Sequence, residues 1–423
     1  MKNSLMTGKM MTGKVMAGKK RRKKILTVFV VIIICIIALS GCERIIEGYM
    51  ESISEHRITT PVRPPTGQIS VTDYNEFTAA ILRLIMEHET SSLILFYHDG
   101  DDVQAEIDRA RNEILNEHPI GAFAVADLIL NPTRIVTHYE IDLEIEYKRT
   151  KEQLDSIVTA SSAQFMQSRL LDVMSVNGEE VIFRSALQIT EEEITELVRD
   201  TYYQNPRKIV MLPIVTVEIF PEQGVEKIYL VQFGYTESLS MLRHIGELLE
   251  LYVSENSGLL TGDTYSEVIL SLTVSLMDST TFNEGAARTI HSHGTQNFAA
   301  TAYGALIRGN AVGEGFAMAF KALADELGFD CYVVLGYYDG MVHAWNIVSL
   351  YGDYYHIDVA MCDLRGIEFA FLKTDEDFEE MYSWDRENTV KCKGELTLDD
   401  IPNRDAILNP HNPDNNGDSN EED

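Results

Sequence analysis

The sequence predicts an α+β protein in which two small repeated units precede a C-terminal domain with a different pattern. Leu93 to His98 aligns with Glu180 to Ser185 at an offset of 87 residues. Each copy continues with a helical stretch and two runs of alternating apolar residues. From Asp263 onward the pattern changes to helices followed by strands. We therefore predict two tandem β-α-β-β modules followed by a third α+β domain.

The length of the chain agrees with several domains. At about 150 residues per domain, 423 residues should form two or three. Neither repeat contains a recognisable reactive motif, so the repeats could bind peptide or glycan or act as spacers. The last residues, Asn409 to Asp423, include no large apolar side chain, so we expect this segment to be disordered. The predicted division is a signal peptide (1–41), a Pro-containing linker (42–70), repeat 1 (71–173), repeat 2 (174–255), the third domain (256–395) and an acidic, disordered tail (396–423).

Charge separates the N-terminus from the rest of the chain. Residues 1–41 contain nine Lys and Arg and no acid, which leaves 26 bases and 66 acids in the remainder. A polyanion of this kind repels phosphate groups and anionic lipid. We therefore expect no nucleic acid partner.

The N-terminus has the pattern of an export signal. A basic cluster over residues 19–24 precedes the uncharged apolar run Ile25 to Leu39. This run is shorter than the ~20 residues of a spanning helix. The sequence Leu39-Ser40-Gly41-Cys42 resembles the lipobox of bacterial lipoproteins, which implies that Cys42 is the lipidated first residue of the mature chain. An uncleaved signal anchor is the alternative. Either arrangement places residue 43 onward on the extracytoplasmic face of the cell membrane.

A buried central helix is predicted from Glu314 to Leu327, with apolar residues at helical spacing and Gly328 as its terminator. The chain enters this helix through Gly313 and its neighbouring glycines. Exposed N–H groups and the helix dipole at such a start would stabilise a thiolate. This is the position at which a cysteine nucleophile would gain most.

Three strands are predicted after the helix, over Cys331 to Tyr338, Val342 to Leu350 and Tyr354 to Ala360. If a two-residue turn joins the last two strands, the residue numbers of each cross-strand pair sum to an odd number. Asp358 then shares a sheet face with His343 and lies diagonally beside it. A carboxylate there would orient the imidazole, as in a Cys-His-Asp triad, although the two could also persist as a hydrogen-bonded pair.

Three blocks in order resemble the transglutaminase-like family in its bacterial form: TAYGALIRGNAVGEGFA (301–317), HAWN (343–346) and YHIDV (355–359). The resemblance spans about Asp263 to Cys392 and implies a papain-like α+β fold. Family members use a cysteine at the helix start as nucleophile, a histidine as base and an aspartate that orients the histidine. His343 and Asp358 match the last two roles, whereas Gly313 stands at the position of the cysteine.

The substitution at this position changes the expected function. Glycine has no side chain, so thiol chemistry at residue 313 is excluded, and loss of a triad nucleophile removes several orders of magnitude of rate. We therefore predict a non-catalytic module without cofactor that binds a polypeptide or cell-wall peptide. Its cleft would include Glu314, with Trp345 and Tyr355 as core residues first and cleft walls second. A peptidase or acyltransferase with a relocated nucleophile and a structural spacer are the alternatives.

The other cysteines are poor replacements for the nucleophile. Cys331 at a strand start is expected to be buried. Cys362 is four residues past Asp358 and would lie about 13 Å from it in an extended strand, at about 3.3 Å per residue. In an exported chain, Cys362 could instead form a disulfide with Cys392.

Two histidines before the central helix suggest a metal site. His291 and His293 would point the same way on a strand and could join His343 or His356 around an ion. No carboxylate or thiol completes this set, and solvated loop histidines are the simpler interpretation. We therefore predict no metal.

Overall fold

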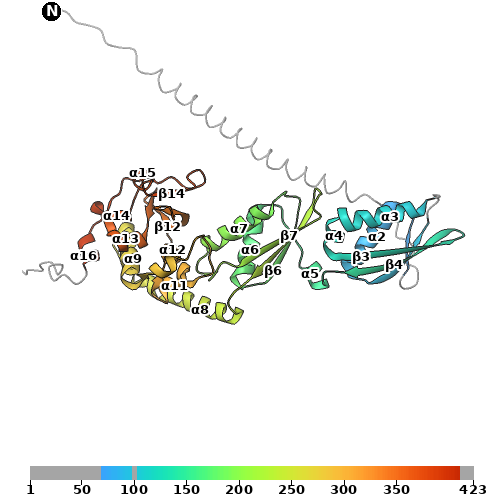
Figure 1. Ribbon diagram of the computed structural model, residues 1–423, viewed down its shortest axis with the longest axis horizontal. Helices are drawn as coiled ribbons and strands as arrows, with labels where there is room; N and C mark the ends of the chain where they lie inside the picture. Colours follow the sequence, from blue (N-terminus) through green and yellow to red (C-terminus); the bar gives the residue numbers. More distant parts are fainter. Residues whose placement is uncertain (1–67, 98–101, 410–423) are drawn as a thin grey trace, which may run out of the picture. The chain divides into compact units, whose positions relative to one another are not determined.

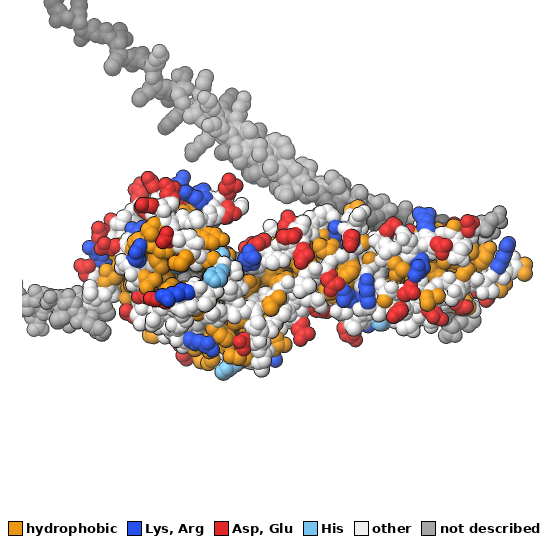
Figure 2. Space-filling model, in the orientation of Figure 1, with side chains coloured by type: hydrophobic (Ala, Val, Ile, Leu, Met, Phe, Trp, Pro, Cys, Tyr) orange, Lys and Arg blue, Asp and Glu red, His pale blue; other side chains and the backbone are white. Residues whose placement is uncertain are grey.

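The computed structural model describes residues 68–97 and 102–409 (Figure 1). The predicted signal peptide, Cys42 and residues 410–423 lie outside these ranges. Within them, no helix combines the length and apolar character needed to cross a bilayer. Helices and strands alternate along the described chain, so the predicted mixed α+β class is confirmed. Acidic and basic side chains are interspersed with apolar ones on the face drawn in Figure 2.

The first sheet has the strand order β1-β2-β4-β3. Asp73 caps the first helix by accepting a hydrogen bond from Glu76 N–H, and the apolar face of that helix buries Phe77 and Ile81. Phe77 stacks on Phe96 of β2 with ring centroids 5.0 Å apart. The elements are β1 (Gln68–Val71), α2 (Tyr74–Glu87), β2 (Ser91–Phe96), α3 (Val103–Asn112), η1 (Glu113–Glu117), α4 (Pro119–Ala124), β3 (Val125–Ile135) and β4 (His138–Tyr147).

The second sheet has the matching order β5-β6-β8-β7. Phe96 and Phe183, which the 87-residue offset aligns, both lie in second strands and are buried. Two short helices separated by β5 precede β6. Because β5 pairs with β6, this sheet begins before residue 174, where we placed the start of repeat 2. The elements are α5 (Lys151–Asp155), β5 (Val158–Thr159), α6 (Ala163–Ser175), β6 (Glu180–Ser185), α7 (Glu191–Gln204), β7 (Ile214–Phe220) and β8 (Lys227–Gly234).

The C-terminal region places the buried helix α12 (Gly313–Glu326) beside an antiparallel sheet of order β13-β12-β11-β14. Asn346 on β12 donates a hydrogen bond to the Ala317 carbonyl of α12, 3.0 Å away, which ties helix to sheet. The strands are β11 (Cys331–Tyr338), β12 (Met341–Leu350), β13 (Asp353–Ile357) and β14 (Tyr382–Trp384). The remaining helices and short strands are α8 (Leu239–Asn256), η2 (Ser257–Leu259), α9 (Tyr265–Ser279), β9 (Thr281–Phe282), α10 (Glu284–Ala287), η3 (Phe298–Ala300), α11 (Ala302–Leu306), β10 (Asn310–Ala311), α13 (Val359–Arg365), α14 (Ile367–Ala370), α15 (Asp375–Phe378), η4 (Leu398–Asp400) and α16 (Arg404–Leu408).

The hairpin between β12 and β13 has the predicted two-residue turn. Its residues Tyr351 and Gly352 have φ of 55° and 98°, as a type I′ turn requires. The pairing of Asn346 with Ile357 places Asp358 opposite Trp345, as the odd-sum rule predicted. The predicted end of the strand at Ala360 is wrong. Asp358 accepts a hydrogen bond from Met361 N–H at 3.1 Å and so begins helix α13.

Residues 396–409 are ordered, which contradicts the predicted disorder of that part of the tail. The side chain of Ile401 is 4% exposed, and Ile407 packs against the main core. Asn403 donates a hydrogen bond to Glu267 on α9 at 2.9 Å. These apolar contacts offset the entropy cost of ordering the segment. The many acidic residues around them led to the wrong prediction.

Candidate functional site

The start of α12 and the imidazole of His343 are in direct contact. A Cβ atom built on Gly313 would lie 2.3 Å from Cε1 and 2.4 Å from Nδ1 of His343. Real Cβ atoms essentially never approach a neighbour closer than 3.0 Å. The imidazole therefore occupies the space that any side chain at residue 313 would need.

His343 and Asp358 come together as the hairpin register predicted. His343 Nε2 lies 2.6 Å from Asp358 Oδ2, and Tyr382 donates its hydroxyl hydrogen to the same oxygen at 2.9 Å. The other carboxylate oxygen accepts the capping bond from Met361. Asp358 is 1% exposed and His343 is 7% exposed. Both carboxylate oxygens accept hydrogen bonds from neighbours that hold the group in place, as expected of an orienting group.

The hydrogen bond to Asp358 determines which nitrogen of His343 faces the helix start. The carboxylate accepts the Nε2 hydrogen, so in the neutral ring Nδ1 is the acceptor, and Nδ1 lies on the side of Gly313. This is the geometry of a base and its orienting carboxylate. Residue 313 itself offers this pair neither a thiol nor a hydroxyl to deprotonate, because glycine has no side chain.

A cleft of about 320 Å³ opens beside this pair. Its polar side is lined by Gly313, Glu314, His293 and His343. Most of the remaining lining is apolar and includes Phe282, Ile290, Val312, Met341, Met361, Leu364 and Met381. A small apolar cleft with a few converging polar groups is typical of a ligand site.

Trp345 and Tyr355, which we predicted as possible cleft walls, do not line the cleft. Trp345 is 1% exposed and its ring packs at an edge against Tyr382, with centroids 5.0 Å apart. Tyr355 pairs with Val348, so its side chain alternates to the opposite sheet face from His343. Both residues are core residues, the first of the two interpretations made from sequence.

Glu314 does line the cleft, and it is almost completely buried. Its Oε1 accepts hydrogen bonds from the Tyr203 hydroxyl at 2.7 Å and from Gly294 N–H at 3.2 Å. Its Oε2 is buried without a partner. Burial raises the pKa of Glu314 to about 7, against the opposing effect of the two hydrogen bonds. Tyr203 belongs to α7, so the helix of the second sheet contributes directly to this site.

His293 is a cleft residue that sequence reasoning assigned to solvent. Its Nε2 bonds to the Gly336 carbonyl at 3.1 Å, its Nδ1 is buried without a partner, and burial lowers its pKa to about 4. His291, by contrast, is exposed. Residues 291–293 form no strand, so the strand geometry expected to point both rings the same way is absent. Neither histidine belongs to a metal-ligand cluster in the described ranges.

The described cysteines are buried and unpaired, which contradicts the suggested disulfide between Cys362 and Cys392. Cys362 lies in α13, one helical turn from Asp358, rather than on the extended strand from which we estimated a separation of about 13 Å. Its thiol donates to the Ile367 carbonyl at 3.6 Å. Burial raises the pKa of Cys331, Cys362 and Cys392, so each remains a thiol. None of them has the thiolate character of a nucleophile.

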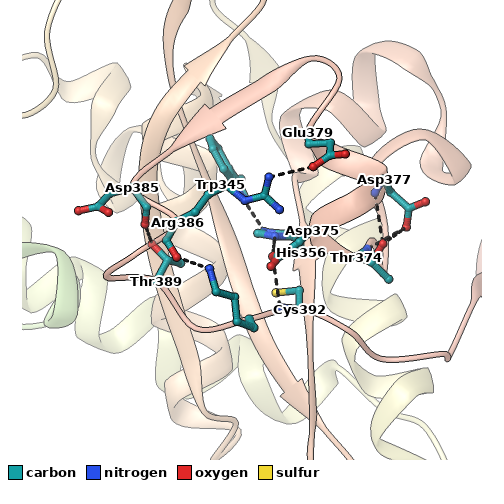
Figure 3. A network of polar contacts seen from close by, with 11 residues as sticks. Trp345, His356, Thr374, Asp375, Asp377, Glu379, Asp385, Arg386, Thr389 and Cys392 are labelled. Atoms are coloured by element: carbon teal, nitrogen blue, oxygen red, sulfur yellow. Dashed lines mark hydrogen bonds and ion pairs between the residues drawn. The ribbon is translucent and has the colours of Figure 1, made fainter.

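A second polar cluster surrounds His356 on the same sheet (Figure 3). His356 Nε2 lies 3.0 Å from Asp375 Oδ1, which also accepts Cys392 N–H at 3.2 Å. One ligand atom from each of these three residues lies within 4.8 Å of the others, so the cluster could in principle hold a metal ion. Trp345 Nε1–H, however, donates to His356 Nδ1 at 2.9 Å. The proton of the neutral ring is then on Nε2, which leaves that atom no lone pair for a metal, and the cluster fits a hydrogen-bond network instead.

Comparisons with known proteins add two similar structures. No protein-family model matches the chain, and no curated protein does. The chain is similar to the crystal structure of a transglutaminase with a TM-score of 0.27 and 11% identity, over 62% of this chain and 66% of that one. It is also similar to a candidate cysteine protease from Cytophaga hutchinsonii with a TM-score of 0.21 and 14% identity, over 37% of this chain and 63% of that one. The chain thus covers less than two thirds of the length of either solved chain.

Proposed function

We propose that this chain is an exported, lipid-anchored protein whose C-terminal region binds a polypeptide or cell-wall peptide in the cleft beside Gly313 without cleaving it. The resemblance to the transglutaminase-like family suggests the ligand class, because members of that family act on amide-bearing chains. The cleft beside His343 is a suitable place for such a chain.

The contact between Gly313 and the His343 ring carries the non-catalytic part of the proposal. A family nucleophile would need a Cβ at residue 313, and that atom would be 2.3 Å from the imidazole. The ring has thus settled into the space of the missing side chain while keeping its bond to Asp358. A site in this state retains groups for binding and lacks the atom that forms the covalent bond.

Two alternatives are less well supported. A relocated nucleophile would need a thiol beside His343, and no hydrogen bond joins that ring to any cysteine within residues 68–97 and 102–409. A purely structural role would be consistent with a closed cleft, whereas a space of about 320 Å³ is present. Binding therefore remains the preferred function.

Turnover and binding should be tested separately. The purified protein is incubated with a glutamine-containing protein and a fluorescent primary amine, and with short peptides, before and after iodoacetamide. We expect peptide binding by calorimetry but no turnover in either state. Turnover confined to Gly313→Cys, in which the His343 ring must shift to admit the new side chain, would also support the proposal. Turnover in the unsubstituted protein that alkylation abolishes would contradict it.

Lipid anchoring is a separate part of the proposal and rests on the basic cluster, the apolar run and the Leu39-Ser40-Gly41-Cys42 sequence. Expression with a radiolabelled fatty acid in a bacterial host should label the full chain and place it in the membrane fraction. Cys42→Ala should lose the label, because the thiol that carries the lipid is absent. Equal labelling of both proteins would exclude Cys42 as the lipidation site.

A further inference from the structure

We infer that the cleft beside Gly313 recognises the C-terminal carboxylate of a polypeptide whose last residue is apolar, and that Arg365 binds this carboxylate. The inference rests on the proposed function and names the chemistry of its ligand.

Arg365 is an unpaired cation in a strongly acidic protein. It is the last residue of α13, it is exposed and it lines the cleft. The chain has 66 acidic and 35 basic residues, yet no Asp or Glu forms an ion pair with Arg365 in the described part of the chain. Asp339 lines the same cleft without pairing with it. The charge of Arg365 is therefore available to an incoming anion.

The guanidinium group is held in place before any ligand arrives. Its Nη2 donates to the Tyr338 hydroxyl oxygen at 3.0 Å, and its central carbon lies 5.0 Å from the centroid of the Phe369 ring. The tyrosine uses only one of the five N–H donors, so the others remain free. A planar guanidinium with free paired donors binds a carboxylate through two parallel hydrogen bonds, and prior ordering lowers the entropy cost of doing so.

Apolar side chains next to Arg365 provide a place for the ligand's last side chain. Met361 and Leu364 precede Arg365 on α13, and Met341 and Met381 face the same cleft. Leu364 is 47% exposed and Met341 is 65% exposed, so water covers them in the free protein. Methionine adapts its shape to varied apolar groups, which suits a site for a range of apolar side chains.

The size of the cleft favours a chain end over a chain that passes through. Its volume of about 320 Å³ is near the lower limit of roughly 300–1,000 Å³ for ligand sites. Such a space holds only a few residues. A C-terminal residue can place its carboxylate on Arg365 and its side chain among the methionines, whereas an internal Asp or Glu must also accommodate chain on both sides.

The experiment compares three forms of one peptide by calorimetry on the full chain. The probes are Gly-Ala-Gly-Ala-Leu as the free acid, the same peptide as its C-terminal amide, and the amide with glutamate in place of the central glycine. We expect the free acid to bind at least about tenfold more tightly than either amide, because hydrogen bonds to charged groups are strong. Arg365→Gln should abolish this preference, and Arg365→Lys, which keeps the charge but loses the planar fork, should reduce it.

Arg308→Gln is the matched control. Arg308 also lacks an ion pair in the described ranges, and it lies over the Phe298 ring at 4.4 Å, but it does not line the cleft. It should leave the preference for the acid unchanged.

The outcomes separate the inference from the proposed function. Equal binding of acid and amide, or a preference that survives Arg365→Gln, would overturn the inference and leave peptide binding intact. Tight binding of the glutamate-containing amide would assign the site to acidic side chains instead of chain ends. Absence of binding by all three probes would overturn both.

Discussion

Two His–Asp pairs lie close together in the C-terminal sheet and differ in what their second ring nitrogen meets. His343 bonds Asp358 through Nε2, and its Nδ1 faces Gly313 beside the cleft. His356 bonds Asp375 through Nε2, and its Nδ1 accepts a hydrogen bond from Trp345. The first pair therefore keeps one nitrogen directed at the site, whereas both nitrogens of the second pair have partners within the fold.

The two pairs also differ in their position relative to the cleft. His356 is 0% exposed and stacks on Phe378 with centroids 4.7 Å apart, so it acts as a core residue with polar partners. His343 is 7% exposed and lines the cleft. Position relative to the cleft, and not the chemistry of the pair, distinguishes the two.

The largest expected difference concerns stability. His356→Ala removes a fully buried ring and leaves Asp375 and the Trp345 N–H without their partner, so it should lower the free energy of unfolding by about 3 kcal/mol or more. His343→Ala should cost about 1 kcal/mol, because Asp358 keeps its bonds to Tyr382 and Met361 and the cleft can admit water. Urea unfolding of both variants checks this, and equal losses would remove the distinction.

The second prediction concerns the free energy of unfolding at acidic pH, to which His356 contributes. Burial lowers the pKa of His356 to about 4, below the ~6.5 of an unfolded histidine. The unfolded chain then binds the additional proton between these values, so stability is fully present above pH ~6.5 and falls as the pH drops towards 4. A shift of this size corresponds to roughly 3 kcal/mol. Burial lowers the pKa of His293 to about 4 as well, so His356→Gln should reduce the slope of this limb without removing it. Urea unfolding across pH measures the slope, and an unchanged slope would contradict the assignment.

A third, smaller effect tests the contact at the helix start. Gly313→Ala places a Cβ against the His343 ring, so either the ring or the helix must shift, at a cost of about 2 kcal/mol. Gly246→Ala on α8 is the control, since its Cβ would meet the nearest atom at 3.5 Å and the helix should gain up to about 1 kcal/mol. Urea unfolding and the NMR signal of the His343 ring report the two effects. Identical behaviour of the variants would show that the ring does not fill this space.

The smallest expected effect concerns the third partner of Asp358. Tyr382→Phe removes the hydroxyl that donates to Asp358 Oδ2 and should lower the free energy of unfolding by about 1 kcal/mol. Tyr337→Phe is the control, because the exposed Tyr337 hydroxyl makes no hydrogen bond within residues 68–97 and 102–409. A loss of the same size in both variants would mean that Tyr382 does not support the pair.

Local sequence rules predicted the part of the candidate site that lies on the β12–β13 hairpin. The two-residue turn determined the register, and the register placed Asp358 beside His343. The end of this strand, however, is predicted wrongly. Asp358 also carries the side chain of a helix cap, and its bond to Met361 ended the strand that we had continued to Ala360. A competing local signal, rather than a distant contact, explains that error.

Other residues of the site gave no usable signal. Tyr382 reaches Asp358 across 24 positions of sequence, and Tyr203 reaches Glu314 across 111. Arg365 resembles any basic residue in the last turn of a helix until its lack of an acidic partner is known. Such features depend on which segments pack together, and a single sequence does not specify that.

The sequence by itself determined that residue 313 supplies no nucleophile, because the absence of a side chain is a covalent property that folding cannot change. It also determined the order of the central helix and the strands that follow it, through local periodicity and turn chemistry. Only the tertiary structure decided that the His343 ring fills the vacated space, that Trp345 and His356 belong to the core, and that Arg365 faces the cleft unpaired. Those outcomes depend on contacts between distant segments, whose geometry is set by packing of the whole region.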